Sequence, residues 1–145
     1  MKGKLLVTAV LVMVGLTLLL YGRPAQASHN TFLAINDIYS ALNAGEVDTA
    51  LASFAEGATA ENKVRKETYR NLSEIRRMLQ EMQRDGRQFD IVDVDMNGNT
   101  ITANVEVMDS GYVWGTETVE AVVKGDKLQS FKVVAFRLEL WRIGR

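Results

Sequence analysis

The sequence predicts a single α+β domain, with three helices followed by an antiparallel sheet, behind an N-terminal signal peptide. Three observations support this prediction. Residues 1–27 combine a charged start with a long apolar run, residues 28–86 carry apolar side chains at helical spacing, and residues 88–143 alternate with a period of two. A block of helices followed by a block of strands is typical of the α+β class.

The leader has the three parts of a secretory signal peptide. Lys2 and Lys4 give a positive start, residues 5–20 form an uncharged apolar run, and residues 25–27 read Ala-Gln-Ala, an A-x-A cleavage site. We therefore expect cleavage near Ala27 and export to the periplasm or the extracellular space. The alternative is an uncleaved N-terminal membrane anchor with the domain outside, because the apolar run approaches the ~20 residues that span a bilayer.

The composition narrows the possible functions of the mature domain, residues 28–145. Removal of the leader leaves 118 residues and takes away three cations and no acid, so the net charge falls from −1 to −4. The chain has no cysteine, which excludes disulfide scaffolds and thiol nucleophiles, and its one histidine, His29, argues against a histidine metal site. The lack of a basic surface argues against a nucleic-acid partner. We expect neither a metal nor a cofactor.

Three helices are predicted in the first half of the mature chain. The first carries apolar residues at positions 32, 35, 38, 39 and 42 and ends near Gly45. The second is short, with apolar residues at positions 47, 50, 51 and 54, and ends near Gly57. The third starts at Asn71, with Glu74 three residues on as in a capping box. The polar stretch 58–69 is predicted to contain a short strand.

A four-stranded antiparallel meander is predicted next. Alternating apolar and polar residues mark the first two strands, and the dipeptide Asn97-Gly98 between them is a strong hairpin signal. Turns that contain glycine and aspartate separate the remaining strands. The four strands are predicted over residues 90–96, 100–108, 112–123 and 128–143.

The last predicted strand is apolar on both faces. Val134, Phe136 and Leu138 share one face, while Phe131 and Val133 belong to the other. A strand with one wet face alternates apolar and polar residues, so both faces of this strand should be covered. One face can pack on the helices. The other requires either a strongly bent sheet or a homodimer through the sheet, because exposed apolar patches are typical of interfaces.

The opening of the mature domain resembles a known superfamily. Residues 38–58, which read IYSALNAGEVDTALASFAEGA, are similar to the start of nuclear transport factor 2-like proteins of the SnoaL-like and ketosteroid isomerase-like groups. The later helix and strands follow in the same order, so the resemblance covers residues 31–143. It implies a cone-like α+β barrel, with three helices on a highly curved antiparallel sheet around an apolar pocket. It also implies that members commonly dimerise through the sheet.

The isomerase chemistry of that superfamily carries over poorly to this sequence. The tyrosine that serves those enzymes as an oxyanion donor aligns with Ile38, one residue before Tyr39. Asn62 takes the position of their aspartate base, and an amide cannot accept a proton near neutral pH. Their neutral buried acid maps onto Glu120, which an apolar pocket would keep protonated. The alternation of that strand leaves the direction of Glu120 open.

The candidate pocket residues are aromatic and polar side chains on several predicted elements. An aromatic ring supplies apolar area with a polar tip, and a charged pair such as Arg137 and Glu139 would orient a ligand. The alternative for that pair is a position at the rim of the sheet or at a dimer edge. The candidates are Tyr39, Phe54, Asn62, Tyr69, Trp114, Glu120, Arg137 and Trp141.

Three functions from different classes follow. The preferred one is an exported, non-catalytic SnoaL-like protein that binds a small apolar or amphipathic ligand in its pocket. The second is a SnoaL-type isomerase, cyclase or hydrolase using carboxylates such as Glu120 or Glu106 with a tyrosine, which requires two titratable groups in one pocket. The third is a structural dimerisation domain with a filled cone. Membrane contact is expected only through an uncleaved leader.

Overall fold

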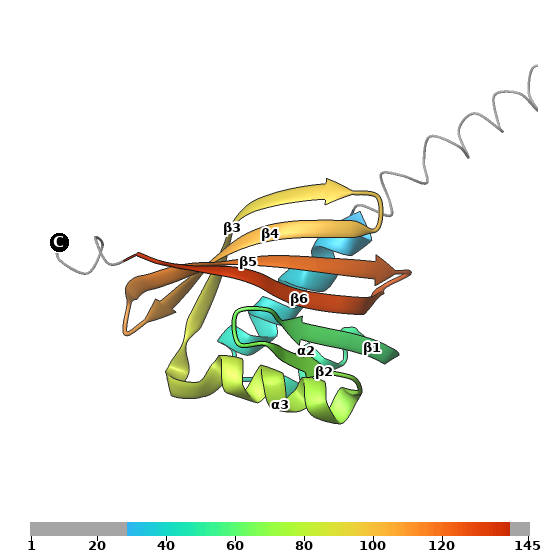
Figure 1. The fold of residues 1–145 in the computed structure, drawn as a ribbon, viewed down its shortest axis with the longest axis horizontal. Coiled ribbons are helices and arrows are strands. Elements are labelled where there is room, and N and C mark those ends of the chain that lie inside the picture. Colours follow the sequence, from blue (N-terminus) through green and yellow to red (C-terminus); the bar gives the residue numbers. More distant parts are fainter. Residues whose placement is uncertain (1–28, 140–145) are drawn as a thin grey trace, which may run out of the picture.

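The computed structural model describes residues 29–139. The predicted signal peptide, residues 1–27, and the candidate Trp141 lie outside the described residues. Within residues 29–139, no helix is long and apolar enough to cross a membrane. A curved six-stranded sheet covers the first helix, and the other helices lie toward one edge of that sheet (Figure 1).

The first helix, residues 29–43, is the centre of the core, and most of its predicted apolar stripe is buried. It ends as predicted. Gly45 has a positive φ of 78°, and its N–H donates to the Leu42 carbonyl at 3.1 Å. The Glu46 N–H donates to the Ala41 carbonyl at 2.8 Å. This pair of bonds is a Schellman motif, which satisfies carbonyls left open at a helix end.

Two shorter helices follow at the edge of the sheet. They are α2, Val47–Leu51, and α3, Leu72–Gln83, with a 3-10 turn, η1, at Arg84–Gly86. The predicted capping of α3 is confirmed. The Asn71 side chain accepts a hydrogen bond from the Glu74 N–H at 3.0 Å, and the Glu74 carboxylate accepts one from the Arg70 N–H at 2.7 Å. These two bonds fix the start of the helix that borders the cavity described below.

Six strands form one sheet in the order β2-β1-β6-β5-β4-β3. They are β1 Phe54–Asn62, β2 Glu67–Tyr69, β3 Gln88–Asn97, β4 Thr100–Asp109, β5 Tyr112–Lys124 and β6 Lys127–Leu138. The predicted meander is confirmed as β3 to β6. The sheet is mixed rather than purely antiparallel, because β1 pairs with β6 in parallel. The α+β class and the curved sheet are as predicted.

The main departure from the predicted elements is β1. The second helix was predicted to reach Phe54, but α2 ends at Leu51 and Phe54 opens a nine-residue strand. Its alanines and glutamates favour a helix locally. The edge of β6 overrides that preference, because the strand pairs along it and places Ala60 beside Phe131.

The curvature of the sheet comes with irregular pairing. The register shifts in β3–β4 near Val92, in β4–β5 at Val107, and in β5–β6 after Thr118. Bulges of this kind bend a strand and increase its twist. The resulting bend wraps the sheet around the first helix, so one face of β6 packs on the core of its own chain (Figure 1).

Asn43 ties the end of the first helix to the start of β3. Its side-chain Nδ2 donates to the Phe89 carbonyl at 2.8 Å, and its Oδ1 accepts from the Phe89 N–H at 2.8 Å. A side-chain amide thus takes the place of a neighbouring strand at this point. The two bonds hold the Phe89 ring at the wall of the cavity.

Candidate functional site

A cavity of about 180 Å³ lies among α3, the β1–β2 hairpin and the strands of the curved sheet. Apolar and polar side chains both contribute to its wall, and several of the polar ones are charged. The apolar lining residues are Val64, Met78, Met82, Phe89, Val107, Trp114, Val133 and Phe136. The polar lining residues are Asn62, Arg65, Tyr69, Glu81, Arg87 and Glu117.

Glu117 places a carboxyl group in this wall, beside several apolar side chains. It lies on β5 in the same phase as the buried Val119 and Ala121, so its side chain turns toward the interior. Its Oε2 is buried and has no hydrogen-bond partner among the described residues. Burial raises the pKa of Glu117 to about 7, although the positive charges of Arg65 and Arg87 act in the opposite direction. Glu117 therefore exists in both protonation states near neutral pH.

Tyr39 supplies a second buried polar atom without a partner. Its ring packs between two phenylalanines, with centroids 5.4 Å from Phe89 and 6.4 Å from Phe131. Its hydroxyl is buried and makes no hydrogen bond within residues 29–139. Burial first, and then the nearby charge of Glu117, raise the pKa of Tyr39 well above its ordinary value. The phenol therefore stays protonated and can donate a hydrogen bond. Tyr39 borders a separate open hollow between the first helix and β3, not the cavity that Glu117 lines.

Arg87 and Trp114 form the next part of the wall. The guanidinium carbon of Arg87 lies 4.8 Å from the centroid of the Trp114 ring, a cation–π contact. The Arg87 Nε is buried without a partner in the described part of the chain. Trp114 lies at the β4–β5 bulge, where pairing passes from Gly115 to Val113 and omits it. The bulge turns its ring toward the cavity, against the alternation of the strand.

Gly115 makes room for the aromatic part of the wall. A Cβ atom at this position would clash with the Phe136 ring and lie 2.7 Å from the Arg137 carbonyl oxygen. The Phe136 ring therefore lies across the glycine and meets Trp114 at a centroid distance of 4.9 Å.

We expect Gly115→Ala to lower the free energy of unfolding by about 1–3 kcal/mol, the usual cost of overpacking. Urea denaturation measures this change. The matched control is Gly57→Ala, because a Cβ at Gly57 meets nothing within 4 Å. An equal effect of the two substitutions would contradict the close packing of Phe136 on Gly115.

The β1–β2 hairpin closes one side of the cavity. The Asn62 Oδ1 accepts a hydrogen bond from the Arg65 N–H at 3.0 Å, so the amide supports the turn. The Tyr69 hydroxyl donates to the Glu67 carboxylate at 2.6 Å, and burial followed by this bond raises the pKa of Tyr69. The Arg77 guanidinium lies 5.9 Å from the Tyr69 ring centroid. Three candidates from the sequence, Asn62, Tyr69 and Trp114, thus border one cavity.

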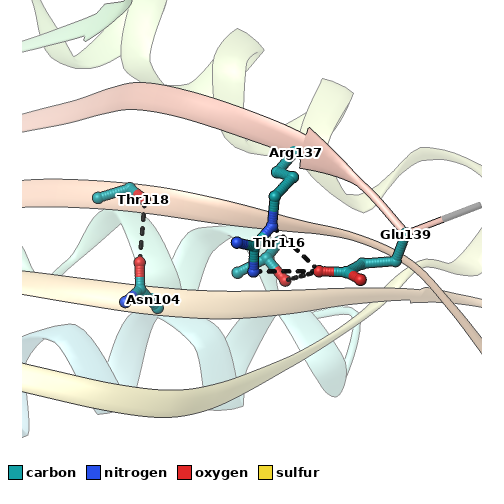
Figure 2. A network of polar contacts seen from close by, with 5 residues as sticks. All are labelled: Asn104, Thr116, Thr118, Arg137 and Glu139. Carbon is teal, nitrogen blue, oxygen red and sulfur yellow. Dashed lines mark hydrogen bonds and ion pairs between the residues drawn. The ribbon is translucent and has the colours of Figure 1, made fainter.

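The remaining candidates lie elsewhere. Phe54 is buried in the core, with its ring centroid 6.0 Å from that of Phe131. Glu120, whose direction the sequence left open, is exposed on β5 and therefore does not supply a buried acid. Arg137 pairs with Glu139 at 3.1 Å, and Thr116 contacts the same carboxylate oxygen at 3.5 Å (Figure 2). This pair lies in a different, open concavity of the sheet.

Sequence reasoning missed Glu117 and Arg87. A signal for Glu117 was present, because a strand that turns Glu120 to solvent turns a residue three positions earlier to the opposite face. Arg87 lies between η1 and β3, outside any helix or strand, so no pattern of apolar and polar residues indicates its direction. Its place could not be found from the sequence pattern.

The cavity brings together the carboxyl groups of Glu81 and Glu117, the phenol of Tyr69 and the guanidinium groups of Arg65 and Arg87. Such groups can form hydrogen bonds, hold charge and transfer protons. Within residues 29–139, no cluster of three or more histidine, cysteine, aspartate or glutamate side chains is arranged to hold a metal ion.

Comparison with known proteins identifies the fold and the family. The SnoaL-like domain family matches residues 35–138, whereas no curated protein sequence matches the chain. A provisionally named ketosteroid isomerase from Kribbella flavida is 15% identical, with 72% of this chain and 76% of that chain covered and a TM-score of 0.64. A nuclear transport factor 2-like protein of unknown function from Cytophaga hutchinsonii is 11% identical, with 79% and 95% covered and a TM-score of 0.58.

An LEH-like epoxide hydrolase from M. tuberculosis is 14% identical, with 79% of this chain and 86% of that chain covered and a TM-score of 0.61. At such low identities, the likeness to solved structures shows the fold alone. The family match covers most of the chain. The chain therefore belongs to the SnoaL-like domain family.

Proposed function

We propose that the domain binds a small, largely apolar molecule in the cavity, with Glu117 holding the polar group of that molecule. The proposal rests on the buried Glu117 Oε2, which has no partner among the described residues, and on the apolar side chains that line the same cavity. A buried polar atom without a partner costs about 1–3 kcal/mol. A ligand that bonds to this atom offsets part of that cost. A few polar groups in an apolar wall are typical of small-molecule sites.

The size of the cavity supports a compact ligand. Its volume of about 180 Å³ is close to that of apolar cavities of roughly 150 Å³ that bind benzene. It is below the roughly 300–1,000 Å³ of sites for larger, drug-sized molecules. A single ring or a short chain therefore suits the cavity better than a fused-ring skeleton such as a steroid.

The test uses three single-ring probes of different charge, namely benzoate, benzamide and benzylamine. Each is titrated against the protein and followed by calorimetry. We expect Val64→Trp to weaken the binding of at least one probe by about tenfold or more, because Val64 lines the cavity and is 50% exposed, so a larger ring is tolerated. Val122→Trp, at an exposed valine outside the cavity, is the control. Failure of all three probes to bind contradicts the proposal.

A second candidate function is proton-transfer catalysis by Glu117. It is favoured by the pKa of about 7, since a group that holds and releases a proton near neutral pH is suited to general acid–base chemistry. Exchange of the methyl protons of acetophenone in deuterated water, followed by NMR, tests it. Acceleration that Glu117→Gln removes and Glu120→Gln retains supports catalysis. No acceleration by the wild type contradicts catalysis and leaves the binding function in place.

We also infer that the protein is exported. The support is the charged start, apolar run and A-x-A site of residues 1–27. Mass spectrometry of the product after expression of the full chain in a bacterial host should show the loss of residues 1–27. Recovery of only the full-length chain from membranes contradicts cleavage.

Dimerisation through the sheet is a further part of the proposed function. It is supported by an open concavity of the sheet that combines the apolar Val92 and Ala135 with polar groups. Among these, the Thr118 hydroxyl donates to Asn104 Oδ1 at 2.9 Å (Figure 2). Native mass spectrometry at micromolar concentration should show a dimer. A monomer alone under these conditions contradicts this part of the proposal.

A further inference from the structure

We propose that the ligand is a small carboxylate whose charged end lies between the guanidinium groups of Arg87 and Arg65. The inference rests on the proposed function and names the chemical class of the ligand. Arg87 precedes β3 and Arg65 lies in the β1–β2 turn, yet both line the same cavity. The fold thus brings two cationic groups to one small apolar space.

The guanidinium group of Arg87 is oriented and has no ion-pair partner among the described residues, which suits it to bind an anion. Its guanidinium group lies over the Trp114 ring, and this contact restricts the plane of the group. Its Nε is buried without an acceptor, and none of the ion pairs among residues 29–139 involves Arg87. A planar guanidinium group donates two parallel hydrogen bonds to a carboxylate, which is the geometry that an unpaired, oriented arginine offers.

Arg65 adds a second positive charge that is only loosely neutralised. Its Nη1 lies 3.7 Å from the Glu81 Oε2, which is longer than a hydrogen bond. The same hairpin region also carries Lys63, Lys66 and Arg70. Glu61 and Glu67 lie among these cations, so the hairpin region as a whole carries mixed charge. The charged side chains that line the cavity are Arg65, Arg87, Glu81 and Glu117, so protonation of Glu117 leaves the cavity with a net positive charge, which attracts an anion.

Glu117 couples this binding to a proton. The titratable and charged groups around it in the described part of the chain are Tyr39 on the first helix, Arg65, Arg87 and the cavity-lining Tyr69 and Glu81. A bound anion disfavours the ionised form of Glu117, so the complex takes up a proton when the free protein is ionised. The affinity for a carboxylate should therefore rise as the pH falls through about 7. The protonated carboxyl group can then donate a hydrogen bond.

The test compares benzoate, benzamide and benzylamine on the protein purified after expression of the full chain. We expect benzoate to bind at least about tenfold more tightly than benzamide, as one charge-assisted hydrogen bond implies. Arg87→Gln should remove this preference. Arg84→Gln changes an exposed arginine of η1 outside the cavity and should retain it. Arg65→Gln provides a second variant if Arg87→Gln does not fold, as judged by circular dichroism.

The outcomes separate this inference from the proposed function. Equal binding of benzoate and benzamide, or tightest binding of benzylamine, overturns the carboxylate class and leaves small-molecule binding intact. Failure of every probe overturns both.

A second measurement follows the pH dependence of benzoate affinity between pH 6 and pH 8. We expect affinity to increase several-fold toward pH 6 in the wild type, because Glu117 takes up the proton in that interval. Glu117→Gln should abolish the pH dependence and keep the preference for benzoate over benzamide. If the affinity of the wild type for benzoate does not change with pH, the bound anion lies away from Glu117. That result overturns a binding site shared by Arg65, Arg87 and Glu117.

Discussion

Replacing Phe131 with alanine is expected to lower the free energy of unfolding by about 3–5 kcal/mol, the usual cost of removing a buried phenylalanine. Phe131 is fully buried on β6, and its ring meets Phe54 of β1 and Tyr39 of the first helix at centroid distances of 6.0 and 6.4 Å. β6 is held between β1 and β5, so the backbone cannot move to fill the space. Urea denaturation, with the midpoint and slope fitted together, measures the change.

The matched control is Val122→Ala on the adjacent strand β5. Val122 is 38% exposed, so its truncation leaves no cavity and should change the free energy of unfolding by less than about 1 kcal/mol. Similar losses for the two variants would mean that Phe131 is not a centre of the core. A loss in the expected range would show that one ring joins the first helix to the parallel β1–β6 pair.

The elements that the sequence predicted best are those whose signals are local. Gly45 ends the first helix because its positive φ suits glycine, and Asn71 with Glu74 caps α3 with its own side chain. The four strands of the meander follow from alternation and short turns. β1 was missed as a full strand because its pairing partner, β6, lies about seventy residues away in the chain. No local pattern contains that information.

The site could be predicted only in part, for a similar reason. Trp114 was predicted as a pocket residue from its aromatic character, whereas the bulge that turns it toward the cavity could not be predicted from the alternation of the strand. The alignment with the isomerases pointed to Glu120, whereas the strand phase turns Glu117 inward and leaves Glu120 exposed. Arg87 is oriented by Trp114, a contact between distant segments. The aromatic and amide residues of the cavity, Asn62, Tyr69 and Trp114, were therefore predicted from the sequence. Its charged residues Glu117 and Arg87 were not.

Glu117→Gln is expected to be more stable than the wild type at pH 8 by about 3 kcal/mol, and to lose this advantage as the pH falls. Burial raises the pKa of Glu117 from an ordinary value of 4.5 to about 7. Between these values the folded protein binds more protons than the unfolded chain. Wild-type stability therefore falls as the pH rises from about 4.5 to about 7, and remains lower above that range. Glutamine has a similar shape and no charge, so the variant avoids this loss.

Urea denaturation at pH 5 and pH 8 tests this prediction, with Glu120→Gln as the control on the same strand. Glu120 is exposed, so its carboxylate stays hydrated in the folded protein. The free energy of unfolding of Glu120→Gln should therefore equal that of the wild type at both pH values. A stability gain at pH 8 that is confined to Glu117→Gln would show that the carboxyl group is held in the cavity at the expense of the fold. If both variants follow the wild type, Glu117 is hydrated in solution. In that case its Oε2 has water as a partner, and no ligand is needed to satisfy this atom.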